Sequence, residues 1–96
     1  MDETISNAII NHRVLTFSYK GYPRTVNPHL LYRDDQHGKR VLHAWQTKGR
    51  SSSRVPPCWG NFHLDEINGL TALDGKFGGA HPDFNATRFL HIITSI

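Results

Sequence analysis

Many side chains of this chain could do chemistry, but their spacing matches no metal-binding motif. The seven histidines are spread along the sequence, at positions 12, 29, 37, 43, 63, 81 and 91. A metal site usually takes two histidines from one strand face or one helix turn, and no two histidines here are two or four residues apart. His43 and His63 could still meet across neighbouring strands. We expect no metal site and no cofactor.

Catalysis by a nucleophile or by paired carboxylates is not indicated either. The eight carboxylates lie almost entirely in expected turns or near the ends of the sequence, and the serines at 51–53 lack the strand–turn–helix setting of a nucleophile elbow. Gly78 and Gly79 precede no helix start with a lysine, so they indicate a turn and not a phosphate loop. We therefore expect no enzyme; a small metal-dependent nuclease or phosphodiesterase is the weakest alternative.

The uneven distribution of charge indicates binding. The net charge is only +3, yet residues 36–63 hold five basic and no acidic side chains. Trp45, Trp59 and Phe62 lie in the same segment. Cations that alternate with aromatic rings suit a ligand with phosphates and stackable bases. The alternative is a solvated loop between core aromatics, because runs of like charge are usually solvated.

The hydrophobic pattern predicts a mostly β scaffold for these residues. Ile5, Ala8 and Ile9 recur at helical spacing, and the segments that follow alternate with a period of two. Pro28 removes a ladder donor from the second strand and predicts an edge or a bulge there. The expected elements are a helix over 3–13 and strands over 14–20, 24–33, 40–47, 59–67 and 70–73.

Two segments do not fit this regular pattern. Residues 48–57 are rich in Gly, Ser and Pro and are expected to form a mobile basic loop, or a simple spacer, between two strands. Residues 83–96 could form a short helix capped by Asp83 or a last strand, and periodicity does not decide between them.

Length and composition predict one small intracellular domain. A chain of 96 residues leaves no room for a second core, so we expect a single domain over 1–96. No apolar run is long enough to span a membrane, and the acidic start does not look like a secretory signal, so we expect a cytoplasmic protein. The single cysteine, Cys58, excludes an internal disulfide and agrees with a reducing compartment.

Several short segments, read in order, resemble the WYL domain family. They cover about three quarters of the chain: AIINHRVLTFSYKG at 8–21, Arg24, NPH at 27–29, VLHAWQ at 41–46 and NFHLDEI at 61–67. The resemblance implies a mainly β (α+β) fold, in which an N-terminal helix leads into a small five-stranded, Sm-like or SH3-like barrel. Family members are ligand-sensing modules of bacterial and phage transcription regulators, and they bind nucleotides or short single-stranded nucleic acid.

On this resemblance we expect a ligand-binding regulatory module for a nucleotide or short single-stranded nucleic acid. The expected binding groove combines residues at family positions with the basic and aromatic side chains of the middle segment. The candidate ligand-binding residues are Arg24, His29, Trp45, Arg50, Arg54, Trp59 and His63.

The chain also departs from the family pattern. The Trp-Tyr-Leu triplet that names the family falls on Arg40, Val41 and Leu42, where only the leucine remains. The strand that usually reads Phe-Arg-Leu-Asp-Arg-Ile has His63 and Glu66 in place of its two arginines. A histidine is mostly neutral at pH 7, so anion binding is expected to be weaker than in the family and dependent on pH.

Two expectations concern partners. The helix-turn-helix domain that usually accompanies the family is absent from these 96 residues, so a separate DNA-binding protein is an expected partner. Open edge strands and the apolar segment 89–93 predict a homo-oligomer. The rival hypothesis is therefore a protein-interaction or oligomerisation module that has lost ligand binding.

Overall fold

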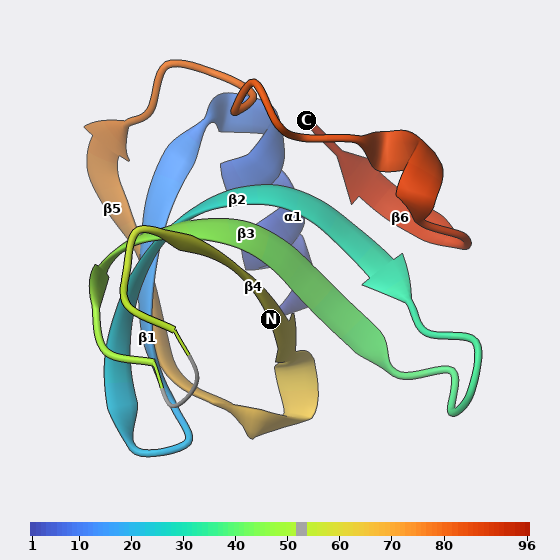
Figure 1. The fold of residues 1–96 in the computed structure, drawn as a ribbon, viewed down its shortest axis with the longest axis horizontal. Coiled ribbons are helices and arrows are strands. Elements are labelled where there is room, and N and C mark those ends of the chain that lie inside the picture. Colours follow the sequence, from blue (N-terminus) through green and yellow to red (C-terminus); the bar gives the residue numbers. More distant parts are fainter. Residues whose placement is uncertain (52–53) are drawn as a thin grey trace.

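The structure, a computed structural model, describes residues 1–51 and 54–96. It confirms a mainly β α+β fold, in which one N-terminal helix precedes a six-stranded sheet (Figure 1). In chain order the elements are α1 (Asp2–Asn11), β1 (Arg13–Tyr19), β2 (Tyr22–Arg33), β3 (Arg40–Gly49), β4 (Cys58–His63), the 3-10 helix η1 (Leu64–Glu66), β5 (Ile67–Lys76), the 3-10 helix η2 (Ala86–Arg88) and β6 (Ile92–Ser95).

The sheet is antiparallel, strongly curved and open. Its order is β4-β3-β2-β1-β5, and β6 pairs with the end of β2. The long strand β2 makes this possible, because its first half pairs with β1 and its second half with β6, while β3 runs along both. The terminal strands β4 and β5 do not pair with each other in the described part of the chain, so a closed five-stranded barrel is not confirmed.

The bulge predicted at Pro28 is present, but β2 is a central strand and not an edge. The register against β3 shifts between Pro28 and Leu30, so that His29 is an extra residue opposite Ala44 and His43. A bulge bends its strand and changes which side chains face each side. Val26 faces the core before the bulge and Leu31 after it. Residues on one face of a regular strand are an even number of positions apart, whereas Val26 and Leu31 are five positions apart. The extra residue of the bulge accounts for this difference.

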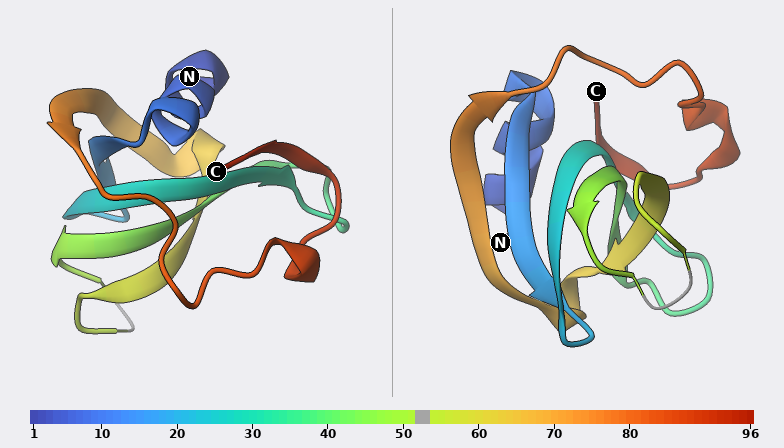
Figure 2. Two further views of the ribbon diagram at one scale, coloured as in Figure 1. Left: turned by 90° about the horizontal axis from the view of Figure 1, so that it is seen from above. Right: turned by 60° about the vertical axis from the view of Figure 1, so that its left-hand side comes forward.

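The inner, concave side of the sheet carries an aliphatic core that α1 covers (Figure 2). Ile5 and Ile9 of the helix are fully buried, as the helical spacing predicts. Phe17, Tyr19 and Phe62 form edge-to-face aromatic contacts at one end of this core. The remaining buried members are Ala8, Leu15, Val26, Leu31, Leu42, Ala44, Leu64 and Ile67.

The opposite, outer side of the sheet is covered by residues 77–91, which we call the C-terminal strap. In Figure 2, left, the strap crosses the sheet on the side away from α1. It is mostly irregular and contains η2, and β6 follows it. Segment 83–96 therefore contains a last strand and also a short 3-10 helix, which is capped by Asn85 and not by Asp83.

The elements after β3 differ in length from the prediction. The expected strand 59–67 ends at His63, because η1 turns the chain there, and the expected strand 70–73 is the middle of the longer β5. The loop expected at 48–57 begins later, since β3 extends to Gly49, and its residues 52 and 53 lie outside the described residues. Among the described residues, no helix is long and apolar enough to cross a membrane.

Candidate functional site

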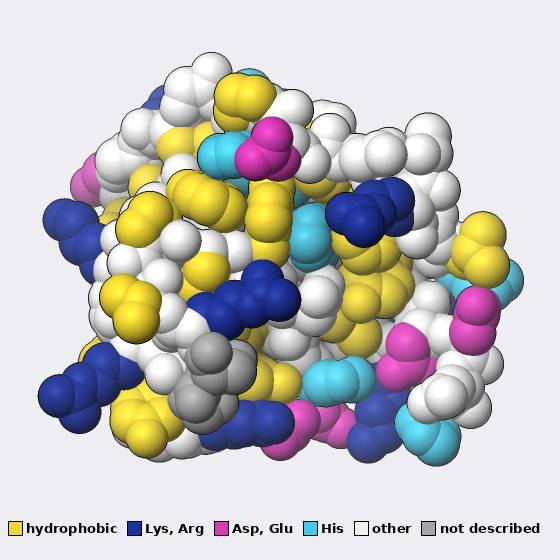
Figure 3. All heavy atoms as spheres, in the orientation of Figure 1, with side chains coloured by type: hydrophobic (Ala, Val, Ile, Leu, Met, Phe, Trp, Pro, Cys, Tyr) yellow, Lys and Arg dark blue, Asp and Glu magenta, His cyan; other side chains and the backbone are white. Residues whose placement is uncertain are grey.

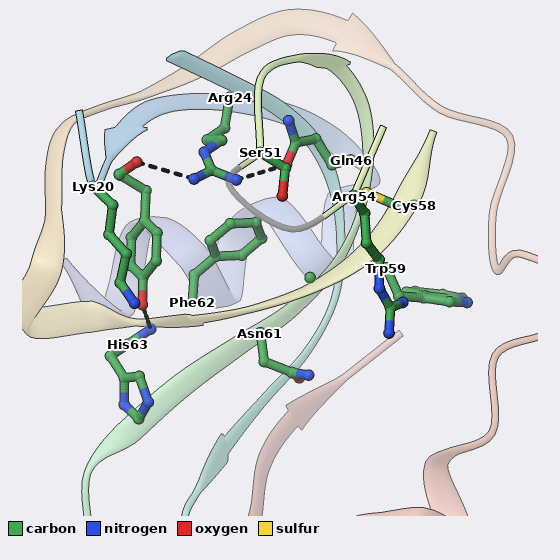
Figure 4. Close-up of a pocket in the computed structure, with 12 residues that line it drawn as sticks. Lys20, Arg24, Gln46, Ser51, Arg54, Cys58, Trp59, Asn61, Phe62 and His63 are labelled. Carbon is green, nitrogen blue, oxygen red and sulfur yellow. Dashed lines mark hydrogen bonds between the residues drawn. The ribbon is translucent and has the colours of Figure 1, made fainter. Parts of the chain in front are cut away.

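A pocket of about 370 Å³ opens beside the free edge of β4 (Figure 4). We call it the inner pocket, because β2 and β3 contribute core-side residues to it. The β1–β2 turn and the loop after β3 complete its walls. It is lined by Tyr19, Lys20, Arg24, Gln46, Ser51, Arg54, Cys58, Trp59, Gly60, Asn61, Phe62 and His63.

Arg24 is the central group of the inner pocket. Its side chain comes from the core-facing side of β2 and is only 5% exposed. One terminal nitrogen donates to Gln46 Oε1 at 3.2 Å and the other to the Tyr19 carbonyl at 3.1 Å, whereas Nε has no acceptor among the described residues. Rings of Tyr19, Tyr22 and Phe62 lie 5.6–5.7 Å from the guanidinium carbon, within the range of cation–π contacts.

The inner pocket is electropositive. Lys20, Arg24, Arg54 and His63 line it, and among the described residues no Asp or Glu does. Burial lowers the pKa of Arg24, but an arginine stays charged at neutral pH. The buried cation therefore has only neutral hydrogen-bond partners in the described structure.

Two glycines allow the backbone to form this pocket. Gly49 ends β3 with φ +96°, and a Cβ there would lie 2.1 Å from the Pro23 carbonyl oxygen. That close approach brings the start of the following loop next to Arg24, and Arg50 N–H donates to the same Pro23 carbonyl. Gly60 leaves the space that the Phe62 ring fills, because a Cβ at Gly60 would be 2.5 Å from that ring.

Four of the seven candidate residues line the inner pocket together: Arg24, Arg54, Trp59 and His63. Figure 4 shows Arg24 and Phe62 on one side of β4 and His63 on the other, as strand alternation predicts. The His63 backbone N–H donates to the Tyr19 hydroxyl, and its buried Nδ1 has no partner among the described residues. Arg50 is separate: it lines a shallow neighbouring hollow with Arg54.

His29 and Trp45 are not part of the inner pocket; both contact the C-terminal strap. His29 is buried, its Nδ1 donates to the Asn27 carbonyl, and its Nε2 accepts the His81 backbone N–H. Both ring nitrogens are therefore used within the protein, and burial lowers the pKa of this histidine. Trp45 packs against His81, with ring centroids 4.1 Å apart.

Sequence reasoning did not identify several lining residues, among them Lys20, Gln46 and Asn61. Gln46 could have been found, because alternation along β3 places it on the same face as Leu42 and Ala44, where a buried amide needs partners. Gln46 Nε2 donates to the carbonyls of Lys48 and Arg50 and so anchors the loop beside Arg24. Lys20 and Asn61 carry no such signal.

The cross-strand pair of His43 and His63 does not form. Asn61 is the residue opposite His43, and His43 Nδ1 lies 2.9 Å from Asn61 Oδ1. Within residues 1–51 and 54–96, no group of three or more His, Cys, Asp or Glu side chains is placed to hold a metal ion. The cationic side chains that line the inner pocket instead offer hydrogen-bond donors and positive charge for an anion.

Comparison with known proteins does not add to this description. A scan against protein-family models, a search of curated proteins and a search of solved structures each found no match to this chain.

Proposed function

We propose that this protein is a regulatory module that binds a phosphate-bearing ligand, a nucleotide or a short single-stranded nucleic acid, in the inner pocket. The observation that carries the proposal is Arg24, a buried guanidinium whose Nε is unpartnered and for which the described residues supply no carboxylate. Burial of an unpaired charge costs several kcal/mol, so such a group is usually paired or functional. An anion in the pocket would supply the missing partner.

The surroundings of Arg24 support a phosphate in particular. Lys20 and Arg54 bring two further cations to the rim, and a guanidinium matches the geometry of phosphate oxygens. The free edge of β4 adds backbone donors. The His63 N–H points away from β3 and is taken by the Tyr19 hydroxyl, but alternation places the N–H groups of Asn61 and Trp59 on the same edge.

We also propose that the module is a divergent WYL-like domain of the Sm-like type, which acts in the cytoplasm with a separate DNA-binding protein. The strand order β4-β3-β2-β1-β5 behind an N-terminal helix is compatible with an Sm-like barrel that has remained open. Arg24, at a position that the family uses, lies in the pocket. His63 lines the same pocket where the family carries an arginine, which supports an altered or weaker anion site.

The test is calorimetric titration with pyrophosphate and with a short oligothymidylate, at low and high salt. Arg24→Met should weaken both by at least about tenfold, because loss of a buried charge contact typically costs about 2 kcal/mol or more. Arg13→Met is the matched control: it removes the same charge from an arginine that pairs with Asp74 outside the pocket. Equal affinities for the parent and Arg24→Met would refute the inner pocket as the anion site.

A protein-interaction or oligomerisation module is the second candidate, and exposed apolar side chains favour it. Leu90, Ile92 and Ile93 are 63%, 43% and 46% exposed, whereas Phe89 of the same segment packs on Tyr32 and His43. Both terminal strands of the sheet also have a free edge in the described structure. Multi-angle light scattering would show a homo-oligomer that Ile93→Lys dissociates; a monomer at high micromolar concentration contradicts this candidate.

A further inference from the structure

A second pocket, of about 350 Å³, lies on the other side of β4, between the sheet and the C-terminal strap. We call it the outer pocket. It shares Arg54, Trp59 and Asn61 with the inner pocket, so the two pockets are neighbours across β4. Its remaining lining residues are His43, Asp83, Asn85, Arg88 and Phe89.

His43 is the most constrained polar group of the outer pocket. Its ring stacks on Trp59, with centroids 4.5 Å apart and an interplanar angle of 11°, and Phe89 packs against it at 4.6 Å. The side chain is nine-tenths buried. Nδ1 is engaged with Asn61 Oδ1, whereas Nε2 makes no hydrogen bond with any described residue. The structure thus holds one ring nitrogen rigidly and leaves the other for a ligand.

The hydrogen bonds around Asn61 determine which ring nitrogen of His43 carries the proton. Asn61 Oδ1 also accepts from the Tyr32 hydroxyl at 3.4 Å, which is consistent with a carbonyl oxygen at that position. A carbonyl can only accept, so the proton of a neutral His43 is on Nδ1 and Nε2 carries a lone pair. Nε2 is not among the buried atoms that lack a partner, so it is open to solvent between the two aromatic rings and can accept an N–H donor of a planar ligand group.

The remaining side chains fit a nucleobase better than a second phosphate. Arg88 and Arg54 are offset by Asp83, so the outer pocket is mixed in charge where the inner one is purely basic. On the face that Figure 3 draws, Lys, Arg and His side chains lie beside hydrophobic and acidic ones. A base offers aromatic faces and several donors and acceptors at its edge, and single-stranded nucleic acids are recognised in this way.

We propose that the outer pocket binds a nucleobase that carries an exocyclic amine, and that His43 Nε2 accepts a hydrogen bond from this amine. The proposal rests on the proposed function, because it places the base of the same ligand whose phosphate lies beside Arg24. A ligand that passes Arg54 reaches both pockets. The module would then discriminate between bases and would not merely bind anions.

The test uses probes that separate the two pockets. Cytidine and uridine monophosphates differ at two adjacent ring positions: cytosine has an exocyclic amine and an unprotonated N3, whereas uracil has a carbonyl and an N3–H. Ribose 5-phosphate lacks the base. Calorimetry should show cytidine monophosphate binding about fivefold or more tightly than the other two, the typical effect of one hydrogen bond. Arg24→Met should weaken all three probes and leave the preference for cytidine unchanged.

His43→Phe keeps a ring on Trp59 but removes the acceptor, so it should abolish the preference while ribose 5-phosphate binds as before. His37→Phe, in the β2–β3 loop, is the matched control and should change nothing. In the unmodified protein, the nitrogen-15 NMR signal of His43 Nε2 should shift with cytidine monophosphate and not with ribose 5-phosphate. This measurement keeps the proposal testable if His43→Phe fails to fold.

The outcomes separate the two proposals. Equal binding of the three phosphorylated probes to the parent overturns the outer pocket as a base site and leaves the anion site intact. If no phosphorylated probe binds but the nucleoside cytidine binds more tightly than uridine, the anion site fails and the base site remains. Absence of binding by every probe overturns both.

Discussion

The two sides of this sheet are packed by different chemistry. On the inner side, α1 and the strands bury aliphatic side chains such as Leu15 and Leu42 with no exposure at all. On the outer side, the C-terminal strap is held by rings: His29 contacts Trp59, Phe77 and Phe84 at centroid distances of 5.1–5.6 Å. Aliphatic burial is insensitive to pH, whereas a layer that contains histidines is not. We therefore expect the inner side to be the stable core and the outer side to be a layer whose stability depends on pH.

The largest effect is expected on the inner side. Leu42→Ala should destabilise the whole domain by roughly 2–5 kcal/mol, the usual range for a buried leucine whose cavity cannot collapse. Leu42 is fully buried near the start of β3 and belongs to the core cluster, so the loss is global. Urea unfolding followed by circular dichroism would measure it. A change below about 1 kcal/mol would contradict the distinction between the two sides.

A smaller and local effect is expected on the outer side. Phe84→Ala removes a half-buried ring that touches His29, His43 and Trp59. The cost should stay below the roughly 3–5 kcal/mol of the same change in a full core, and it should appear as local opening. Hydrogen exchange should accelerate at the His81 amide, which donates to His29, while core amides keep their protection. Uniform acceleration would mean that the strap and the core unfold as one unit.

The pattern of residues predicted the inner side far better than the outer side. Helical spacing in α1 and alternation in β1 report directly on burial against one core, and Pro28 marked the bulge. The strap lacks periodicity, because its order comes from contacts between rings far apart in the sequence, such as Trp45 with His81. For the same reason His29 looked like a ligand contact, while its two hydrogen bonds within the protein could not be foreseen.

The candidate site, too, could be predicted from the sequence only in part. Basic and aromatic composition directed attention to the segment around Arg54 and Trp59, and both residues line the inner pocket. It could not show that Arg24 is buried without a carboxylate, because that depends on the curvature that brings β2 and the edge of β4 together. A one-residue register change, such as the bulge at His29, also decides which side of β2 each later residue faces.

The pH dependence of the free energy of unfolding should also distinguish the two sides of the sheet. Burial is the main cause of the lowered pKa of His29 and of His43 in the folded protein. The unfolded chain then binds more protons below its ordinary histidine pKa of about 6.5, so the free energy of unfolding should decrease as the pH falls through that value. The upper limit is about 1.4 kcal/mol per pH unit for each histidine. His81 and His12 add repulsion at His29, and His29 and Arg88 add it at His43.

Urea unfolding at about pH 7.5 and about pH 5.5 measures this loss of stability. His43→Phe should reduce the pH dependence, because one of the two buried histidines no longer titrates. His37→Phe, which alters an exposed histidine in the β2–β3 loop, should leave it unchanged. Equal stability of the parent at both pH values would contradict the prediction, because it would show that His29 and His43 bind protons as readily in the folded protein as in the unfolded chain.

The smallest change in stability is expected where the inner side carries its one buried guanidinium. Arg24→Met removes the charge but keeps a long apolar side chain against Tyr19, Tyr22 and Phe62. It loses hydrogen bonds to Gln46 and the Tyr19 carbonyl, worth about 1 kcal/mol each, and it relieves a desolvation cost of similar or larger size. The free energy of unfolding should therefore change by less than about 1 kcal/mol, or increase, because apolar replacements of buried charges are often neutral or stabilising. Thermal unfolding without ligand measures this change, and the same scan with pyrophosphate should stabilise the parent and not the variant. A large destabilisation without ligand would show instead that Arg24 is retained for stability, because the inner side would then need its charge and hydrogen bonds as much as its leucines.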